Sequence, residues 1–208
     1  MRPMKLFYAP GACSLAPHVV LHWTGAPYEA VRVGYGSPEL LAVNPAGAVP
    51  ALDTGEGWTL TQAGAILHYL ARRFPEAGLG ADASLRGEAE FDRWSSFFTG
   101  DLHPAFFPLF SPGRYTVAKD VAAQEGVRQA ARALVARRLA LLNAHLAGQP
   151  FILGQRRTVL DAYALPMLRW AVAKLPDGLS TYPAVQAYLD QISVDPDVKE
   201  VIAVEEAT

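Results

Sequence analysis

The sequence predicts a chain of two parts, a small α/β domain followed by an all-α domain. Three observations predict this fold class. Strand and helix signals follow one another in the order β-α-β-α-β-β-α over residues 1–76, and strand alternation is almost absent after residue 85. Between them, residues 77–84 contain Gly78 and Gly80 and show no periodicity. We therefore predict domains at 1–76 and 85–208, joined by a linker at 77–84.

The elements of the first domain follow from local signals. A short apolar strand at 6–9 is ended by Pro10 and Gly11, and a helix begins near Ser14 and ends at Gly25. The other elements are predicted as a strand at 28–33, a helix at 38–43 that Ser37 caps, strands at 49–52 and 58–61 joined by a glycine-bearing loop, and an amphipathic helix at 63–73.

The second domain is predicted to be helical throughout. The Thr158-Val-Leu-Asp161 segment resembles a capping box, which predicts a helix that begins there and is central and buried. The expected helices are one at 85–110 interrupted at Pro104, one at 119–146 with an apolar stripe, one at 162–174 after the capping box, and two more at 183–192 and 197–205.

Composition excludes several classes of protein. The 18 Lys and Arg against 20 Asp and Glu give a net charge of −2, which offers no footprint for nucleic acid or anionic lipid. Hydrophobic residues make up 51% of the chain, so a sizeable core can form, but no apolar stretch is long enough to span a membrane. A single cysteine rules out an internal disulfide framework and points to a reducing setting. We expect a soluble, cytoplasmic protein.

Cys13 is the first candidate for chemistry. It lies at a strand-to-helix turn, where backbone N–H groups and the positive end of the helix favour a thiolate. The alternative is that Cys13 is a small buried hydrophobic residue. Ser14 beside it is either the helix N-cap or a hydroxyl that donates to a bound anionic sulfur.

Backbone groups are the second set of candidates. Val49-Pro50 stands at the start of a strand, where a cis proline would leave the Val49 main chain free for an extended ligand, although a trans proline is the commoner case. Gln62-Ala63 opens a helix whose N-terminal amides can hold a carboxylate.

The histidines offer weaker signals. His18 and His22 have the i, i+4 spacing of two zinc ligands, but the residue after His18 is Val19 and no further cysteine completes a site. We therefore expect no metal. His103 stands in an aromatic helical stretch, where a role in the core or an interface is the structural alternative.

Three segments together resemble a known family: residues 5–14 (KLFYAPGACS), 44–52 (NPAGAVPAL) and 101–106 (DLHPAF). In this order and spacing they resemble the glutathione S-transferases, most closely the bacterial beta class, whose members begin with a similar Pro-Gly-Ala-Cys-Ser segment. The likeness covers nearly the whole chain. It implies a thioredoxin-like first domain, a helical second domain that carries the electrophile site, and glutathione as co-substrate.

The resemblance assigns roles to individual residues. Cys13 would lie against the glutathione sulfur and be able to form a mixed disulfide, Ser14 would help to stabilise the thiolate, and His103 would lie beside them. The implied glutathione-binding residues are Tyr8 on the first strand, Val49 with a cis Pro50 against the cysteinyl unit, Gln62 and Ala63 at the γ-glutamyl carboxylate, and Asp101, which would reach the γ-glutamyl end across a homodimer interface.

Three departures from the family pattern bear on affinity. Ala63 stands where the family usually has Ser, Gln62 where the beta class usually has Glu, and Ala46 where Lys is common. The segment at 33–44 is also shorter than the beta-class pattern, so no residue there is assigned a role. One missing hydroxyl hydrogen bond weakens binding by about 0.5–1.5 kcal/mol and does not abolish it.

Three functions follow from these residues. The first is conjugation of glutathione to small hydrophobic electrophiles, which implies a role in detoxification. The second is glutathione-dependent reduction of a disulfide or peroxide through a mixed disulfide on Cys13. The third is a non-catalytic interaction protein of the same fold, which the substitutions at Ala46 and Ala63 motivate.

Overall fold

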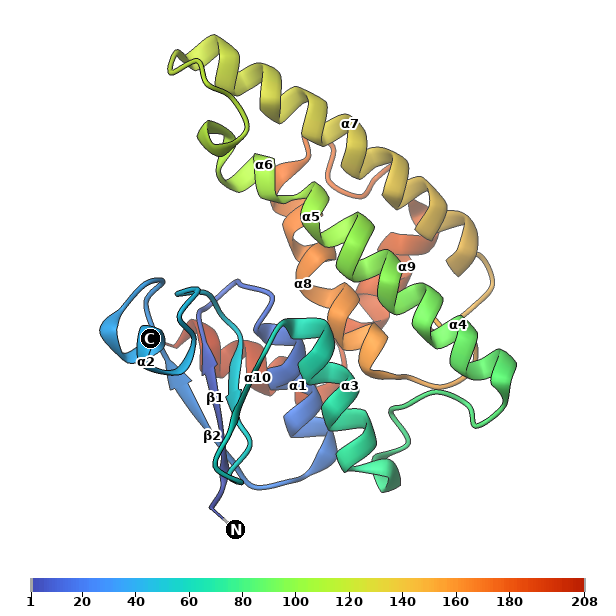
Figure 1. Cartoon of the computed structure of the whole chain (residues 1–208). Helices are drawn as coiled ribbons and strands as arrows, with labels where there is room; N and C mark the ends of the chain where they lie inside the picture. Colours follow the sequence, from blue (N-terminus) through green and yellow to red (C-terminus); the bar gives the residue numbers. More distant parts are fainter. Residues whose placement is uncertain (1, 208) are drawn as a thin grey trace.

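The computed structural model describes residues 2–207 and contains a four-stranded mixed sheet in its N-terminal part (Figure 1). The strands lie in the order β2-β1-β3-β4, with β1 and β2 parallel and the other pairs antiparallel. Their bounds are Met4–Tyr8 for β1, Tyr28–Arg32 for β2, Ala51–Asp53 for β3 and Thr59–Thr61 for β4. The predicted strand order along the chain is confirmed, with shifts of one or two residues at the strand ends.

Helices cover both faces of this sheet. Helices α1 (Leu15–Thr24) and α3 (Ala63–Arg73) pack together on one face, and α2 (Pro38–Val43) lies on the other. The α2 side has its own small core, which includes Phe7, Leu40 and Ala51. The thioredoxin-like arrangement follows from this pattern, because strands of period two alternate with amphipathic helices that each have a sheet face to cover.

The C-terminal part is helical. Figure 1 shows α4, α5 and α6 following one another along α7, with α8 next to α1 and α3. The bounds are Leu85–Ser96 for α4, His103–Ala105 for α5, Phe107–Phe110 for α6, Val121–Leu146 for α7, Val159–Lys174 for α8, Pro183–Ser193 for α9 and Pro196–Glu206 for α10, with short 3-10 turns at Pro75–Ala77 and Pro112–Arg114. No helix among the described residues is long and apolar enough to cross a membrane.

The predicted helix at 85–110 differs from the structure. Helix α4 gives way to a π-helical segment at Phe97–Leu102, and short helices follow. Pro104 and Pro108 have no N–H to donate to the preceding turn, so a regular α-helix does not continue through them. A π-helical turn shifts the phase of every later side chain, and here the first of these is His103.

Helix α8 begins with the predicted capping box. Thr158 Oγ1 accepts from the backbone N–H of Leu160, and Asp161 accepts from the Thr158 N–H at 2.6 Å. The same carboxylate also accepts from the N–H of Ile152 and from the hydroxyl of Tyr188. Asp161 has no solvent-exposed surface, and burial raises the pKa of its carboxyl although these hydrogen bonds oppose the shift. The capping box therefore anchors a central helix.

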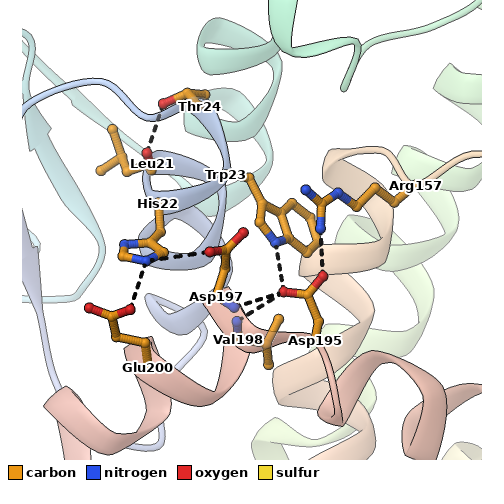
Figure 2. A network of polar contacts seen from close by, with 9 residues as sticks. All are labelled: Leu21, His22, Trp23, Thr24, Arg157, Asp195, Asp197, Val198 and Glu200. Atoms are coloured by element: carbon orange, nitrogen blue, oxygen red, sulfur yellow. Dashed lines mark hydrogen bonds and ion pairs between the residues drawn. The ribbon is translucent and has the colours of Figure 1, made fainter.

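The last helix, α10, packs back on α1. Figure 2 shows the surface part of this contact, where His22 lies between Asp197 and Glu200 while Asp195 accepts from the indole N–H of Trp23. Deeper in, His18 Nδ1 lies 2.8 Å from a carboxylate oxygen of Glu205, and both side chains are at least 97% buried. The two histidines at i, i+4 spacing thus hold α10 in place.

Candidate active site

Cys13 lies in the turn that joins β1 to α1. Gly11 takes up a left-handed φ of 71°, and the Ala12 N–H donates to the Ala9 carbonyl at 3.2 Å. The thiol is partly buried, and its sulfur lies 3.6 Å from the Val49 carbonyl oxygen, to which it donates. Burial raises the pKa of the Cys13 thiol to about 12. The prediction of a favoured thiolate is therefore wrong, because desolvation outweighs the backbone hydrogen bonding at the start of the helix.

Ser14 and Tyr8 do not line the cleft that Cys13 faces. The buried Ser14 hydroxyl donates to the Ala9 carbonyl and accepts from the Ala9 N–H, each at 3.2 Å. It therefore closes the turn, and it makes no side-chain cap on α1. Tyr8 is buried in the core, with its ring 5.0 Å from that of His18. The structure corrects both placements: alternate residues of a strand point to opposite faces, and Tyr8 points to the α1 side.

Val49 and Pro50 lie opposite the Cys13 turn. The peptide bond between them is cis, as the resemblance implies. Both residues line the cleft, and the Val49 N–H donates no hydrogen bond to the described residues. This main-chain donor is therefore available to an extended ligand that passes Cys13.

Gln62 and Ala63 form the next part of the cleft, at the start of α3. Gln62 has a φ of 71°, and among the described residues no other non-glycine residue has a positive φ. Such a conformation costs about 1–3 kcal/mol and is typical of ligand-binding sites. The N-terminal turn of α3 that follows it, from Ala63 to Ala65, also lines the cleft. Arg72 lines the cleft from the end of the same helix.

His103 lines the same cleft from the helical domain. Its Nδ1 lies 2.9 Å from the hydroxyl oxygen of Tyr163 on α8, and its ring lies 5.2 Å from that of Trp170. Burial lowers the pKa of His103 to about 4, so the imidazole is neutral at pH 7. The structure brings Cys13, His103, Val49, Pro50, Gln62 and Ala63 to one cleft of about 1630 Å³.

Asp101 lies outside this cleft. It is exposed in the π-helical segment, and its carboxylate pairs with Arg138 of α7 at 3.0 Å. The predicted contact of Asp101 with a second chain stays a prediction. Among residues 2–207 no three His, Cys, Asp or Glu side chains are grouped as a metal site.

Several residues of the cleft are missing from the sequence-based prediction. Trp170 of α8 donates its indole N–H to the Gly11 carbonyl at 2.7 Å and so ties the helical domain to the Cys13 turn. Further additions include Tyr35, His68, Phe107, Phe110, Arg114, Tyr115 and Tyr163. The sequence contains a signal for two of these residues. Phe107 and Phe110 follow His103 at spacings of four and seven, which place residues on the same face of a helix.

Comparison with known proteins identifies the family. The family model described as the glutathione S-transferase N-terminal domain matches residues 2–72, and the model of the C-terminal domain matches residues 125–191. A glutathione S-transferase of Xanthomonas campestris pv. campestris is 41% identical over 208 residues, which is 97% of this chain and 98% of that protein.

Solved structures agree with this. A sphingomonad glutathione S-transferase complexed with glutathione is 38% identical, with a TM-score of 0.86 over 98% of this chain and 100% of that chain. A beta-class glutathione S-transferase of Sphingomonas chungbukensis is 36% identical, with a TM-score of 0.85 over the same shares. The chain belongs to the glutathione S-transferase family. Its similarity within that family includes the bacterial beta class, so the predicted family and fold are confirmed.

Proposed function

We propose that this chain binds glutathione in the cleft and transfers its sulfur to a small hydrophobic electrophile. The observation that carries the proposal is the composition of the cleft. One side, from the sheet domain, offers backbone polar groups around Cys13, and the other side, from the helical domain, offers aromatic rings. A tripeptide thiol needs the first kind of surface and an apolar electrophile needs the second.

The sheet side suits an extended tripeptide. The Val49 N–H would pair with the cysteinyl unit of glutathione in the manner of an added strand. The first turn of α3, at Gln62 and Ala63, would hold the γ-glutamyl carboxylate with its free N–H groups and its positive end. In this position the tripeptide sulfur would lie near Cys13. A relative that is 38% identical to this chain was solved in complex with glutathione, which supports glutathione as the ligand.

The reaction needs a glutathione thiolate. The thiol proton leaves to solvent, the sulfur attacks the electrophilic carbon to form a C–S bond, and the leaving group departs with its electron pair. Because Cys13 has a raised pKa, it stays a thiol. Its S–H would turn from the Val49 carbonyl oxygen to donate a hydrogen bond to the glutathione sulfur. His103 is neutral and would position the sulfur and the electrophile; it would not act as an obligate base.

Reduction through a mixed disulfide is the second candidate, since Cys13 faces the cleft. In this route the Cys13 thiolate attacks the glutathione sulfur of a mixed disulfide between glutathione and the substrate, and the substrate leaves as a thiolate. The thiolate of a second glutathione then attacks the Cys13–glutathione disulfide, which forms oxidised glutathione and frees the Cys13 thiolate. The thiolate of a group whose pKa is about 12 is scarce at pH 7, which favours conjugation. A chain that catalysed neither reaction and did not bind glutathione would support the interaction-protein alternative.

Variants at Cys13 separate the two reactions. We would measure conjugation of 1-chloro-2,4-dinitrobenzene and reduction of hydroxyethyl disulfide by the wild type, Cys13→Ala and Cys13→Ser. Losing one donor to a charged sulfur slows conjugation about tenfold in Cys13→Ala, while Cys13→Ser keeps a hydroxyl donor and stays within about threefold. Complete loss of conjugation in both variants would overturn the proposed donor role and indicate a covalent role for Cys13.

We also propose the setting in which the enzyme works. A free cysteine and the family resemblance support a cytoplasmic homodimer with a role in detoxification. In such a dimer the exposed Asp101 would reach the partner's γ-glutamyl site. Sedimentation equilibrium of the wild type and Asp101→Asn tests whether the chain forms a homodimer. The affinities of the two proteins for glutathione test whether Asp101 contributes to the γ-glutamyl site.

A further inference from the structure

The helical side of the cleft is built from aromatic rings with open faces. Phe107 and Phe110 each keep 42% of their surface exposed, and Tyr115 keeps 50%. Behind them the Phe110 ring meets Trp170 edge to face at 5.1 Å, and the His103 ring lies 5.0 Å from Phe107. Exposed rings fixed by neighbouring rings form a ready surface for a planar aromatic ligand.

The charge of the cleft has one sign. Arg72 and Arg114 line it, and none of the described lining residues is Asp or Glu. Arg114 makes no ion pair with any residue of 2–207, whereas most arginines of the helical domain pair with a carboxylate, as Arg132 does with Glu125. With His103 neutral, these two guanidinium groups give the lining a positive charge, which favours anionic ligands.

The two arginines serve different halves of the cleft. Arg72 belongs to α3, on the side proposed for glutathione. Arg114 ends the 3-10 turn that follows α6, four residues after Phe110 and directly before Tyr115. Backbone hydrogen bonds from Arg114 to Ser111 (3.1 Å) and from Tyr115 to Pro112 (2.9 Å) fix this turn. Arg114 is therefore the cation that lines the aromatic half, while Lys174 outside the lining has its Nζ 5.9 Å from the centroid of the Phe110 ring.

We propose that Arg114 selects the second substrate, and that this substrate is an aromatic electrophile bearing a carboxylate or sulfonate group. The inference rests on the proposed function and specifies its substrate class. The ring would lie on Phe107, Phe110 and Trp170, and the anionic group would pair with the guanidinium of Arg114. In the reaction the glutathione sulfur forms a C–S bond to the ring, halide leaves with the bonding electron pair, and the thiol proton goes to solvent.

A pair of matched substrates tests this. We would compare kcat/KM for 4-chloro-3,5-dinitrobenzoate and for neutral 1-chloro-2,4-dinitrobenzene in the wild type, Arg114→Gln, Arg114→Lys and the control Arg137→Gln. Arg137 is an exposed arginine of α7 outside the cleft. We expect kcat/KM for the benzoate, divided by kcat/KM for the neutral substrate, to fall about tenfold in Arg114→Gln. The same ratio recovers in part in Arg114→Lys and is unchanged in the control. An unchanged ratio in Arg114→Gln would overturn the proposal.

Binding of unreactive analogues separates this inference from the proposed function. Calorimetry with 3,5-dinitrobenzoate and 1,3-dinitrobenzene measures the anion preference without any reaction. If neither chloro compound is conjugated but the benzoate binds better through Arg114, the proposed function fails and the anion site stands. If both chloro compounds are conjugated and Arg114→Gln prefers the benzoate over the neutral analogue as strongly as the wild type does, the anion site fails and the proposed function stands.

Discussion

The two sides of the cleft are built in different ways. The sheet side presents main-chain groups at the Cys13 turn, at Val49 and at the first turn of α3. The helical side presents large side chains, Phe107, Phe110 and Trp170, whose positions depend on the phase of helices. In the proposed function the first side would recognise glutathione by its backbone, and the second would leave room for the electrophile to differ between relatives.

This difference predicts which substitutions disturb each side of the cleft. Turns that present backbone groups tolerate changes of side chain as long as the local conformation is kept. The aromatic side chains of the helical side keep their positions only while their helices stay in place. Residues far from the cleft that hold these helices therefore affect the cleft.

The largest effect is expected at the anchor of α8. Asp161→Ala removes the acceptor of the Ile152 and Thr158 N–H groups and of the Tyr188 hydroxyl, all in the core. Buried donors without a partner cost about 3–5 kcal/mol of unfolding free energy in total. Urea unfolding measures this, with the exposed Asp190→Ala as control. A loss of unfolding free energy below about 1 kcal/mol would mean that α8 does not depend on Asp161 for its position.

A second effect is expected from His103 as the pH falls. Its pKa is about 4 in the folded chain and about 6.5 when unfolded, so the unfolded chain takes up the proton first. Stability is therefore lost as the pH falls from about 6.5 to 4, by roughly 2–3 kcal/mol for this partly buried group. Urea midpoints across this pH range for the wild type and His103→Gln isolate the contribution. Parallel curves for the two proteins would contradict the lowered pKa.

Removing the hydrogen bond from Trp170 to the Gly11 carbonyl, which joins the two sides, should have a smaller effect. Trp170→Phe keeps an aromatic face but removes the hydrogen bond to the Gly11 carbonyl, which is worth about 1 kcal/mol. We expect the KM for the electrophile to rise several-fold, while the Kd for glutathione changes less. Trp58→Phe, an exposed tryptophan outside the cleft, is the control. Equal changes in both constants would show that the two sides act as one surface.

The smallest effect is expected on the sheet side. Ala63→Ser adds a hydroxyl at the start of α3, where a bound carboxylate would accept its hydrogen bond. We expect glutathione affinity to rise by about 0.5–1.5 kcal/mol, or two- to tenfold, by isothermal titration. The exposed Ala130→Ser on α7 is the control. Weaker binding by Ala63→Ser would place the γ-glutamyl carboxylate elsewhere.

Sequence reasoning predicts the features that local backbone geometry determines. Pro10, Gly11, Pro50 and the Thr158 capping box act through such geometry, which a short segment already expresses. The order of strands and helices follows from the same kind of signal. For this reason most of the fold and the backbone part of the site could be predicted.

The errors have a common physical cause. The raised pKa of Cys13, the inward placement of Tyr8 and the closing role of Ser14 all depend on tertiary burial, which a local pattern does not contain. Trp170 reaches the cleft only because α8 packs on α1, more than 150 residues after the Cys13 turn it contacts. The π-helical segment changes the phase before His103, so spacing alone does not give the direction of the later rings.

The most direct test of the account is a crystal structure of the protein with S-(2,4-dinitrophenyl)glutathione, the product of conjugation. Two contacts are predicted together. The tripeptide lies along Val49 and the start of α3 with its sulfur beside Cys13, and the dinitrophenyl ring lies on Phe107, Phe110 and Trp170. A product bound with its ring away from these residues, or with its tripeptide off the Val49 main chain, would contradict the division of the cleft into a backbone side and an aromatic side.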